Sequence, residues 1–398
     1  MSFIYFTDNV CTSYKLEIKR FHDYFVANGW SIVTDPAQAD LIFVGTCVAF
    51  ENLERESLER LREVNQLGKQ VVAYGCLTTF NPTGLAMVHD GIRIATTEAE
   101  RVGSLLAEPT IRLEDIPEPS TFRSKEDYRL YDLTKRFVNT SLGCAFVCSF
   151  CPHKLGIGNL RSRPPDDIVK QIHNLVSEGV RIVVLTGSDT GAYGIDLNTT
   201  SPTLLREVLD IHAGFEIHVA QFNPAWVLKY RDGLLPLFSN PRVTDIQIPI
   251  QTTSPRLLRL MRRPCDTDRI DAFLQLVRRE NEKAIFRTDL LVGFPTETEQ
   301  ELMETLEFAT RVFDEIAVYA FERKTGVPLE NMGLEFYTAD EVHARAELAI
   351  QCIANVPGRL VHQGGQGPET LVALEKRKEE LRQTRYLGCK PSCPLASE

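Results

Sequence analysis

The 398-residue sequence has no hydrophobic run long enough to cross a bilayer. Its first ten residues, MSFIYFTDNV, lack a basic segment followed by an apolar stretch, so no secretory signal is evident. An excess of positive charge is also missing, because 44 lysines and arginines stand against 54 aspartates and glutamates, a net charge of -10. These absences predict a cytoplasmic protein without a generally basic surface for nucleic acid, although they leave room for a local basic patch.

Cysteine, in contrast, is plentiful, with ten residues in the chain. In a cytoplasmic protein this number points to metal binding or catalysis rather than to a disulfide framework. Three of the cysteines lie in the segment SLGCAFVCSFCPHK, as Cys144, Cys148 and Cys151. Thiolates that gather in this way surround a soft metal or an iron–sulfur cluster, or form a disulfide.

The number of cysteines in this segment narrows the choice. Structural zinc sites and simple iron–sulfur sites use four ligands. Three thiolates leave one iron of a cubane cluster open, where a cofactor or substrate can bind. The CxxxCxxC spacing, with Phe150 directly before the last cysteine, resembles that of the radical S-adenosylmethionine (SAM) enzymes, in which SAM holds the open iron through its amino and carboxylate groups. The alternatives are three structural cysteines or a redox cluster.

The first hundred residues alternate strand and helix patterns. Apolar, β-rich runs at residues 2–9, 41–46 and 71–75 are separated by segments with helical periodicity. This βαβαβ pattern predicts a parallel sheet that is covered on both faces.

A cysteine follows each of these three strands, namely Cys11, Cys47 and Cys76. In an open parallel sheet the carboxyl ends of the strands share one edge, and ligands bind at that edge. We therefore expect the three cysteines to converge in space and to hold a second cluster. The alternative for each cysteine alone is the role of a small buried hydrophobic residue.

The next segment, residues 107–135, is rich in proline and charge and predicts an extended linker. From residue 136 to about 330, strand and helix patterns alternate again. Six β/α repeats predict a partial barrel of parallel strands, whose chemistry sits at the carboxyl ends of the strands. The expected strands span residues 137–142, 181–187, 216–222, 245–251, 284–294 and 315–322.

The predicted fold class is therefore α/β. It begins with an N-terminal parallel α/β domain over residues 1–106 and the linker over 107–135. A partial (β/α)6 barrel of the radical SAM kind follows over 136–330. A helical C-terminal extension and tail over 331–398 completes the prediction.

Polar groups and glycines lie at several barrel strand ends, in LTGSDTGAYG, PIQTTS and TDLLVGFPTET. Each could be ordinary turn chemistry alone. Together, on the face that carries the cysteine motif, they predict a SAM pocket. The expected cofactor-binding residues are Phe150, Thr186, Gly187, Asp189, Gln251, Asp289 and Gly293. Four arginines are expected to contact substrate: Arg161, Arg163, Arg287 and Arg323.

Taken in order, these segments resemble the radical SAM methylthiotransferases over most of the chain. The matching elements are the three dispersed N-terminal cysteines, CxxxCxxC, RSRP, LTGSDTGAYG, PIQTTSPRLLRLMRR and TDLLVGFPTETEQELMETLEF. The resemblance implies two 4Fe-4S clusters, a SAM cluster on Cys144, Cys148 and Cys151 and an auxiliary cluster on Cys11, Cys47 and Cys76.

The resemblance also implies an activity. Family members transfer a methylthio group to an unactivated C–H position, using a 5′-deoxyadenosyl radical and sulfur associated with the auxiliary cluster. It further implies SAM as cofactor and an electron donor such as flavodoxin or ferredoxin. We expect a monomer that does not bind membranes.

The sequence departs from the family pattern in places that bear on the substrate. The second cysteine reads GTC instead of NTC, QSGS becomes QTTS, and the segment before Pro328 reads AFERKTGVP instead of YSPRPGTPA. The tail after Pro357 has no run of alternating strands, so we expect the usual C-terminal RNA-binding β-barrel domain to be absent. These features favour a peptide, protein or small natural product over transfer RNA as substrate.

Three alternatives to this function stay open. The first is a radical SAM enzyme that inserts sulfur without methyl transfer, and the second is a tRNA methylthiotransferase. The third is a non-enzymatic iron–sulfur protein that binds a partner. A terminal CxxxC, Cys389 and Cys393, could bind metal, carry sulfur or belong to a mobile tail with free thiols.

Overall fold

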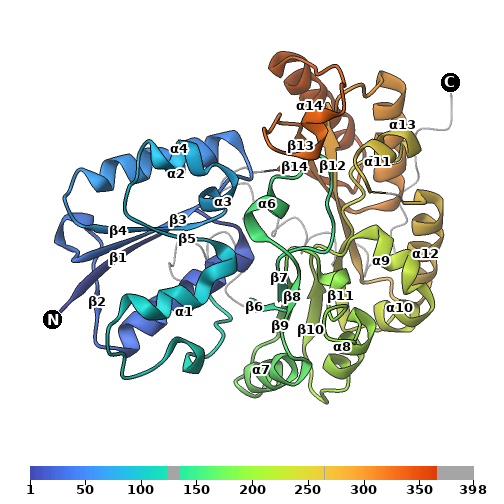
Figure 1. Cartoon of the computed structure of the whole chain (residues 1–398). Helices are drawn as coiled ribbons and strands as arrows, with labels where there is room; N and C mark the ends of the chain where they lie inside the picture. The colour runs from blue at the N-terminus through green and yellow to red at the C-terminus, as the bar shows by residue number, and fades with distance from the viewer. Residues whose placement is uncertain (123–134, 264, 365–398) are drawn as a thin grey trace.

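The computed structural model describes residues 1–122, 135–263 and 265–364. These residues form two lobes that lie side by side (Figure 1). The smaller, N-terminal lobe holds a sheet built from residues 3–94, and the larger, barrel lobe holds a sheet built from residues 135–363. Each lobe has its own hydrophobic core.

The N-terminal lobe is a five-stranded parallel sheet in the order β2-β1-β3-β4-β5. The central strand β3 is buried at all six positions, as expected for a parallel strand that is covered on both faces. Its strands are β1 (Phe3–Asp8), β2 (Ser31–Ile32), β3 (Leu41–Thr46), β4 (Gln70–Gly75) and β5 (Ile92–Ile94). Its helices are α1 (Thr12–Ala27), α2 (Glu51–Asn65), α3 (Leu77–Phe80) and α4 (Pro82–Ala86), with 3-10 turns η1 (Pro36–Gln38), η2 (Thr96–Leu105) and η3 (Leu113–Asp115).

The three strands expected from the sequence are therefore present, and two short edge strands are added. Cys47 and Cys76 directly follow β3 and β4, and Cys11 lies three residues after β1. Described linker residues pack on the N-terminal lobe, since Arg20 of α1 forms an ion pair with Glu118 at 2.6 Å. The described part of this segment contains the turn η3, and its Leu113 and Ile116 side chains belong to the core of the N-terminal lobe.

The barrel lobe is a seven-stranded parallel sheet in the order β14-β13-β12-β11-β10-β9-β6. Its strands are β6 (Lys135–Asn139), β9 (Ile182–Thr186), β10 (Glu216–Val219), β11 (Val243–Gln247), β12 (Ile285–Val292), β13 (Glu315–Ala320) and β14 (Leu360–Gln363). A short antiparallel pair, β7 (Ser141–Leu142) and β8 (Arg161–Ser162), brackets the cysteine motif.

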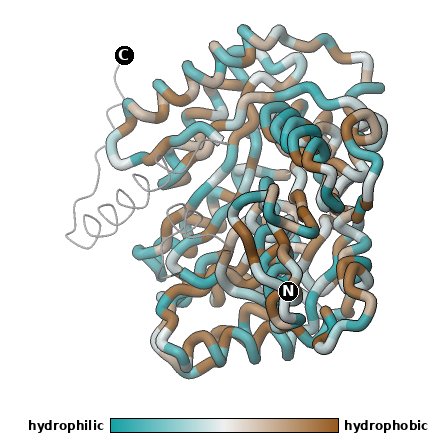
Figure 2. The backbone as a smooth tube through the Cα atoms, turned by 90° about the vertical axis from the view of Figure 1, so that its left-hand side faces the viewer, coloured by the Kyte–Doolittle hydropathy of each residue, from teal (hydrophilic) through white to brown (hydrophobic). Residues whose placement is uncertain are grey.

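Helices follow most of the barrel strands and cover the outside of the sheet (Figure 1). They are α6 (His153–Ile157), α7 (Pro165–Ser177), α8 (Ser201–Leu209), α9 (Pro224–Lys229), α10 (Arg231–Phe238), α11 (Pro255–Leu260), α12 (Thr267–Glu280), α13 (Glu299–Val312) and α14 (Ala339–Ala354), with 3-10 turns η4 (Thr190–Ala192) and η5 (Pro328–Asn331). Hydrophobic and hydrophilic residues alternate along these helices, as expected for one buried face each (Figure 2).

The six expected barrel strands are confirmed, and the sheet continues further than the sequence indicated. Strand β14 pairs in parallel with β13 in the same sheet, and α14 packs on both strands. The two elements come from the stretch after residue 330 that was assigned to a helical extension. The charged segment of the tail, with Cys389 and Cys393, lies outside the described residues.

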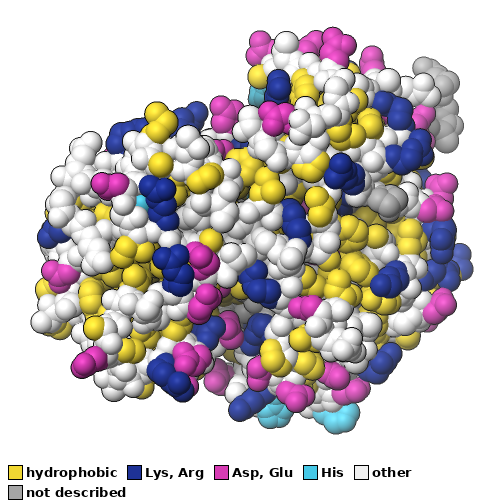
Figure 3. All heavy atoms as spheres, viewed as in Figure 1, with side chains coloured by type: hydrophobic (Ala, Val, Ile, Leu, Met, Phe, Trp, Pro, Cys, Tyr) yellow, Lys and Arg dark blue, Asp and Glu magenta, His cyan; other side chains and the backbone are white. Residues whose placement is uncertain are grey.

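No helix in the described ranges is long and apolar enough to cross a membrane. On the face drawn in Figure 3, side chains of both charge signs are interspersed rather than gathered into one large field.

Candidate functional site

The CxxxCxxC segment forms a loop between β7 and α6 that is pinned to the barrel lobe. Ser149, at the centre of the loop, donates from its backbone N–H to Met261 O at 3.0 Å and from its hydroxyl to Leu260 O at 2.6 Å. Its own carbonyl accepts from Leu329 N at 2.8 Å. The loop is therefore held by three backbone groups, and its cysteines are fixed relative to the barrel.

The three N-terminal cysteines lie together at the carboxyl edge of their sheet. A negative charge on Cys47 raises the pKa of Cys11, and charges on Cys11 and Cys47 both raise the pKa of Cys76, after the larger effect of burial in each case. The three residues follow the carboxyl ends of β1, β3 and β4, which are neighbouring strands of one parallel sheet. The strand ends thus bring together three thiols that are 65 positions apart in the sequence at most.

The two groups of cysteines abut where α6 meets the N-terminal lobe. Cys151 also contributes to the raised pKa of Cys76. A Cβ atom on Gly156 of α6 would come within 2.5 Å of the Cys76 Cβ, so only glycine permits this approach. The Thr96 hydroxyl of the N-terminal lobe donates to Gly156 O at 2.7 Å and fixes the contact.

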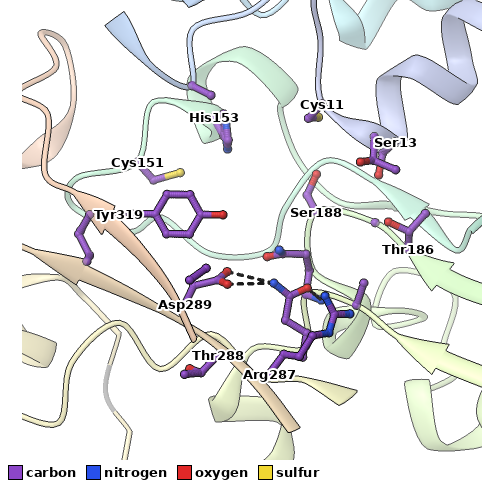
Figure 4. A pocket seen from close by; sticks show the side chains of 18 of the residues that line it. Cys11, Ser13, Cys151, His153, Thr186, Ser188, Arg287, Thr288, Asp289 and Tyr319 are labelled. Carbon is purple, nitrogen blue, oxygen red and sulfur yellow. Dashed lines mark hydrogen bonds between the residues drawn. The ribbon is translucent and has the colours of Figure 1, made fainter. Parts of the chain in front are cut away.

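A cavity of about 640 Å³ opens between the lobes, and both contribute to its wall. The N-terminal lobe supplies the loop after β1, the first residues of α1 and the two residues before α2, and the barrel lobe supplies its strand ends and interior. Figure 4 shows Cys11 and Cys151 at the cavity and the Tyr319 ring projecting into it from β13.

The interior of the barrel is polar where it meets this cavity. The Gln247 amide donates to both oxygens of Asp289, at 3.0 and 3.2 Å, and dashed lines mark these bonds at Asp289 in Figure 4. The Arg287 guanidinium pairs with Asp245 at 2.5 Å. Further cavity residues from neighbouring strands are His218, Glu315 and His362. A barrel closed by apolar layers has no such lining, so this interior is suited to hold a polar ligand.

Eight of the residues singled out in the sequence line the cavity: Cys11, Phe150, Cys151, Thr186, Gly187, Gln251, Arg287 and Asp289. Gln251 adopts a left-handed conformation with φ of 69°. Its backbone bonds to both Asp289 and Leu291 of β12, so its place beside the strand is fixed.

Other expected pocket residues make contacts away from the cavity. The Asp189 carboxylate accepts from the Trp226 indole at 2.9 Å and from Asn223 N at 3.5 Å, and burial raises its pKa to about 6. Gly293 has φ of 77° and donates to Glu297 at 2.8 Å. Both residues shape loops at the site instead of lining the cavity.

Three of the four expected substrate arginines also have structural partners. Arg161 donates to Thr96 O at 3.2 Å across the lobes, and Arg163 donates to Asn139 O at 2.7 Å. The Arg323 guanidinium lies over the Phe336 ring, 4.6 Å from its centroid. Only Arg287 lines the cavity, and it does so as the partner of Asp245.

Lys324, the residue after Arg323, lies in the cavity wall. Lys324 is buried, with its ammonium 3.4 Å from Glu54 of α2 and 3.7 Å from Glu322. Beside it the rings of Phe50 and Tyr319 stack across the lobes, with centroids 6.0 Å apart. These residues join the lobes at the cavity, and sequence reasoning did not single them out.

A period-two pattern could have found part of the interior lining. Asp245 and Gln247 flank Ile246 in β11, and Ile248 follows the strand, so the polar pair faces one side. No comparable signal marks Phe50 or Lys324, because their place depends on how the lobes meet.

The donor set fits iron–sulfur clusters. Each group offers three soft sulfur ligands, and all eight described cysteines are free thiols. Burial raises the pKa of Cys144 to about 12, so binding of a metal there must displace a proton. Within the described ranges, no three His, Cys, Asp or Glu side chains form a group that could hold a single metal ion.

Comparison with known proteins gives two family matches. Residues 138–309 match the Radical SAM superfamily, and residues 4–95 match the Uncharacterized protein family UPF0004. Radical SAM proteins use a 4Fe-4S cluster and SAM, and methylthiotransferases carry a second cluster.

Two curated relatives carry methylthiotransferase names. The probable threonylcarbamoyladenosine tRNA methylthiotransferase of Methanocaldococcus jannaschii is 29% identical over 70% of this chain and 66% of its own length. The ribosomal protein uS12 methylthiotransferase RimO of Thermotoga maritima is 28% identical over 76% of this chain and 72% of its own length. The chain thus spans about two thirds of the first relative and somewhat more of the second.

Solved structures with the same fold include the radical SAM methyltransferase TsrM of Kitasatospora setae, with a TM-score of 0.63 and 13% identity over 96% of this chain and 100% of that one. The radical enzyme OxsB has a TM-score of 0.56 and 14% identity over 96% of this chain and 62% of that one. These two likenesses concern the fold alone. The paired domain matches and the curated relatives show that the chain belongs to the radical SAM methylthiotransferases, a family of enzymes.

Proposed function

We propose that this protein is a two-cluster radical SAM methylthiotransferase that forms a C–S bond at an unactivated C–H position. The observation that carries the proposal is that two groups of three free cysteines abut beside one cavity between the lobes. Cys144, Cys148 and Cys151 would hold the SAM cluster, and the N-terminal cysteines would hold the auxiliary cluster. The bound cofactors would supply a 5′-deoxyadenosyl radical and the sulfur to be transferred.

The chain itself would position the reactants and keep out water. Gln247 and Asp289 form a fixed pair of polar groups on neighbouring strands, which suits the orientation of a polar ligand. Phe50 and Tyr319 stack in the cavity wall on the side of the N-terminal lobe and narrow the access of solvent there. A reactive radical needs such protection, because solvent or a wrong hydrogen donor would otherwise quench it.

For the substrate we propose a peptide, protein or small natural product in preference to transfer RNA. The net charge of -10 and the interspersed surface charges support this preference. The altered segment after β13 supports it too, since Lys324 from that segment enters the cavity wall. A low-potential flavodoxin or ferredoxin would deliver electrons to the chain, which would act as a monomer.

Anaerobic reconstitution tests the two clusters. The full-length chain should bind about eight irons, four for each cluster, and Ala in place of Cys144, Cys148 and Cys151 should remove about half. The matched control is Cys352→Ala, which removes a free thiol outside both groups and should leave the iron content unchanged. A wild-type content of about four irons would contradict the auxiliary cluster.

Product analysis then tests the activity. Under reducing turnover, 5′-deoxyadenosine together with S-adenosylhomocysteine is expected, because methyl transfer produces the second compound. Release of 5′-deoxyadenosine alone would favour sulfur insertion without methylation, and release of neither would favour the non-enzymatic alternative. Total transfer RNA, uS12 protein and a peptide fraction from the source cell should be offered in parallel, with modification expected outside the RNA.

A further inference from the structure

A partly buried arginine contacts the CxxxCxxC loop. Arg263 follows α11, and its Nη1 donates to the Cys148 sulfur at 3.7 Å. Its Nη2 donates to Pro249 O at 2.8 Å, and its backbone N–H donates to Leu258 O at 2.8 Å. The Cys148 sulfur is thus contacted by a guanidinium whose position is fixed from two other sides.

The guanidinium lies close to the cysteine loop, with its Nη1 in contact with the Cys148 sulfur. No carboxylate of the described residues forms an ion pair with it, and its buried Nε has no hydrogen-bond partner in that part of the chain. The guanidinium therefore contacts a sulfur and a carbonyl oxygen, without an ion pair to a described carboxylate.

Two neighbouring arginines provide the contrast. Arg259 and Arg262 lie within four positions of Arg263 but are exposed, so water screens their charges. Arg263 alone among these three combines partial burial with a contact to a cysteine of the loop.

The reduction potential of an iron–sulfur cluster depends on its net charge, on hydrogen bonds to its sulfurs and on its exposure to solvent. A fixed cation and an N–H···S bond both stabilise the state that carries one more electron, and they do so more strongly where water is excluded. Accordingly, we propose that Arg263 is a positioning residue that raises the reduction potential of a cluster held by Cys144, Cys148 and Cys151. This inference rests on the proposed function, and the electron would come from a low-potential one-electron donor.

A redox titration of the reconstituted full-length chain tests the role of Arg263, with dithionite as reductant and the electron paramagnetic resonance signal that responds to SAM as readout. Arg263→Gln removes the charge and should shift the one-electron equilibrium toward the oxidised cluster at least tenfold, which is about 59 mV for a one-electron couple. Arg263→Lys keeps a charge without the planar fork and should shift it by less. The controls Arg259→Gln and Arg262→Gln should leave the potential at the wild-type value.

An Arg263→Gln potential equal to that of Arg262→Gln would overturn the proposal. If Arg263→Gln does not retain its iron, the reduction potential of Arg263→Lys is measured instead. A potential below the wild-type value would support the role of Arg263, and a wild-type potential would overturn it. Iron content separates this result from the wider function. An Arg263→Gln chain with about eight irons and an unchanged potential would contradict only the role of Arg263, whereas a wild-type chain without clusters would contradict the proposed function.

Discussion

At the scale of single residues, burial opposes the ionisation of the Glu297 carboxyl. It is 2% exposed, accepts from Gly293 N at 2.8 Å and lies 3.6 Å from Arg345. Burial outweighs both partners and raises its pKa to about 7 from 4.5. Between these two values the native chain holds a proton that the unfolded chain has released, so stability must fall as pH rises through this window.

This sign gives a prediction for Glu297→Gln in the metal-free chain. The variant lacks the titrating group but keeps an acceptor for Gly293 N, so the wild type should lose stability relative to it between pH 5 and pH 8. The relative change should be on the order of 1–3 kcal/mol. Melting temperatures across this range measure it, and the exposed Glu299→Gln serves as control. Parallel curves for wild type and Glu297→Gln would contradict the prediction.

Residues whose side-chain type and spacing indicate their chemistry were predictable from the sequence. Residues whose role depends on where the fold places them were not. Cys144, Cys148 and Cys151 are recognisable because thiols at that spacing have few other uses. Arg263 is one arginine of an RLMRR run, and its partial burial and its contact with Cys148 distinguish it from Arg262. Sequence reasoning therefore proposed the ligands and missed the cation beside them.

At the scale of elements, strand ends explain why the site could be anticipated. Continuous apolar runs such as Leu41–Thr46 can be recognised as buried strands from their composition. Because the strands of a parallel sheet end at the same edge, the residues that follow them are expected to lie at that edge. The short strands β5 and β14 were not predicted. β5 has only three residues, and β14 has four, of which two are polar. Their pairing is decided by the neighbouring strand and not by their own sequence.

Helix α6 provides a prediction at the element scale, because it carries Gly156 against Cys76. Ala at Gly156 would place a methyl group 2.5 Å from the Cys76 Cβ and 3.0 Å from its Cα, so α6 or the N-terminal lobe must shift. We expect Gly156→Ala to destabilise the chain by about 1–3 kcal/mol and to lower its iron content from about eight toward four.

Iron analysis and melting curves measure the effect of Gly156→Ala. The matched control is Gly214→Ala, where an added Cβ would meet no atom within 4 Å and where the backbone is not left-handed. Equal iron content in the two variants would show that the contact between α6 and Cys76 does not support the N-terminal cysteines.

At the scale of the whole molecule, the cavity exists only because two lobes with separate cores meet. Beside the cavity the lobes are joined by two contacts, which we call the lobe joint. They are the stack of Phe50 on Tyr319 and the ion pairs of Lys324 with Glu54 and Glu322. Glu322 also accepts from the backbone N–H of Glu51 at 2.6 Å, at the start of α2. The segment after β13 thus ties the barrel to the helix that follows Cys47.

Lys324→Met tests this joint, because it keeps most of the side-chain volume and removes the charge. Glu54 and Glu322 would then face each other without the shared cation, at a cost of about 1–2 kcal/mol, since both carboxylates keep some access to water. Hydrogen exchange should become faster at the start of α2 and after β13, while the sheets keep their protection. The exposed Lys69→Met is the control for loss of a lysine in the same lobe as Glu54. If exchange in Lys324→Met matches that control at both segments, the lobes are held by the aromatic stack and by α6 instead, and the charge at position 324 is free to act on the substrate.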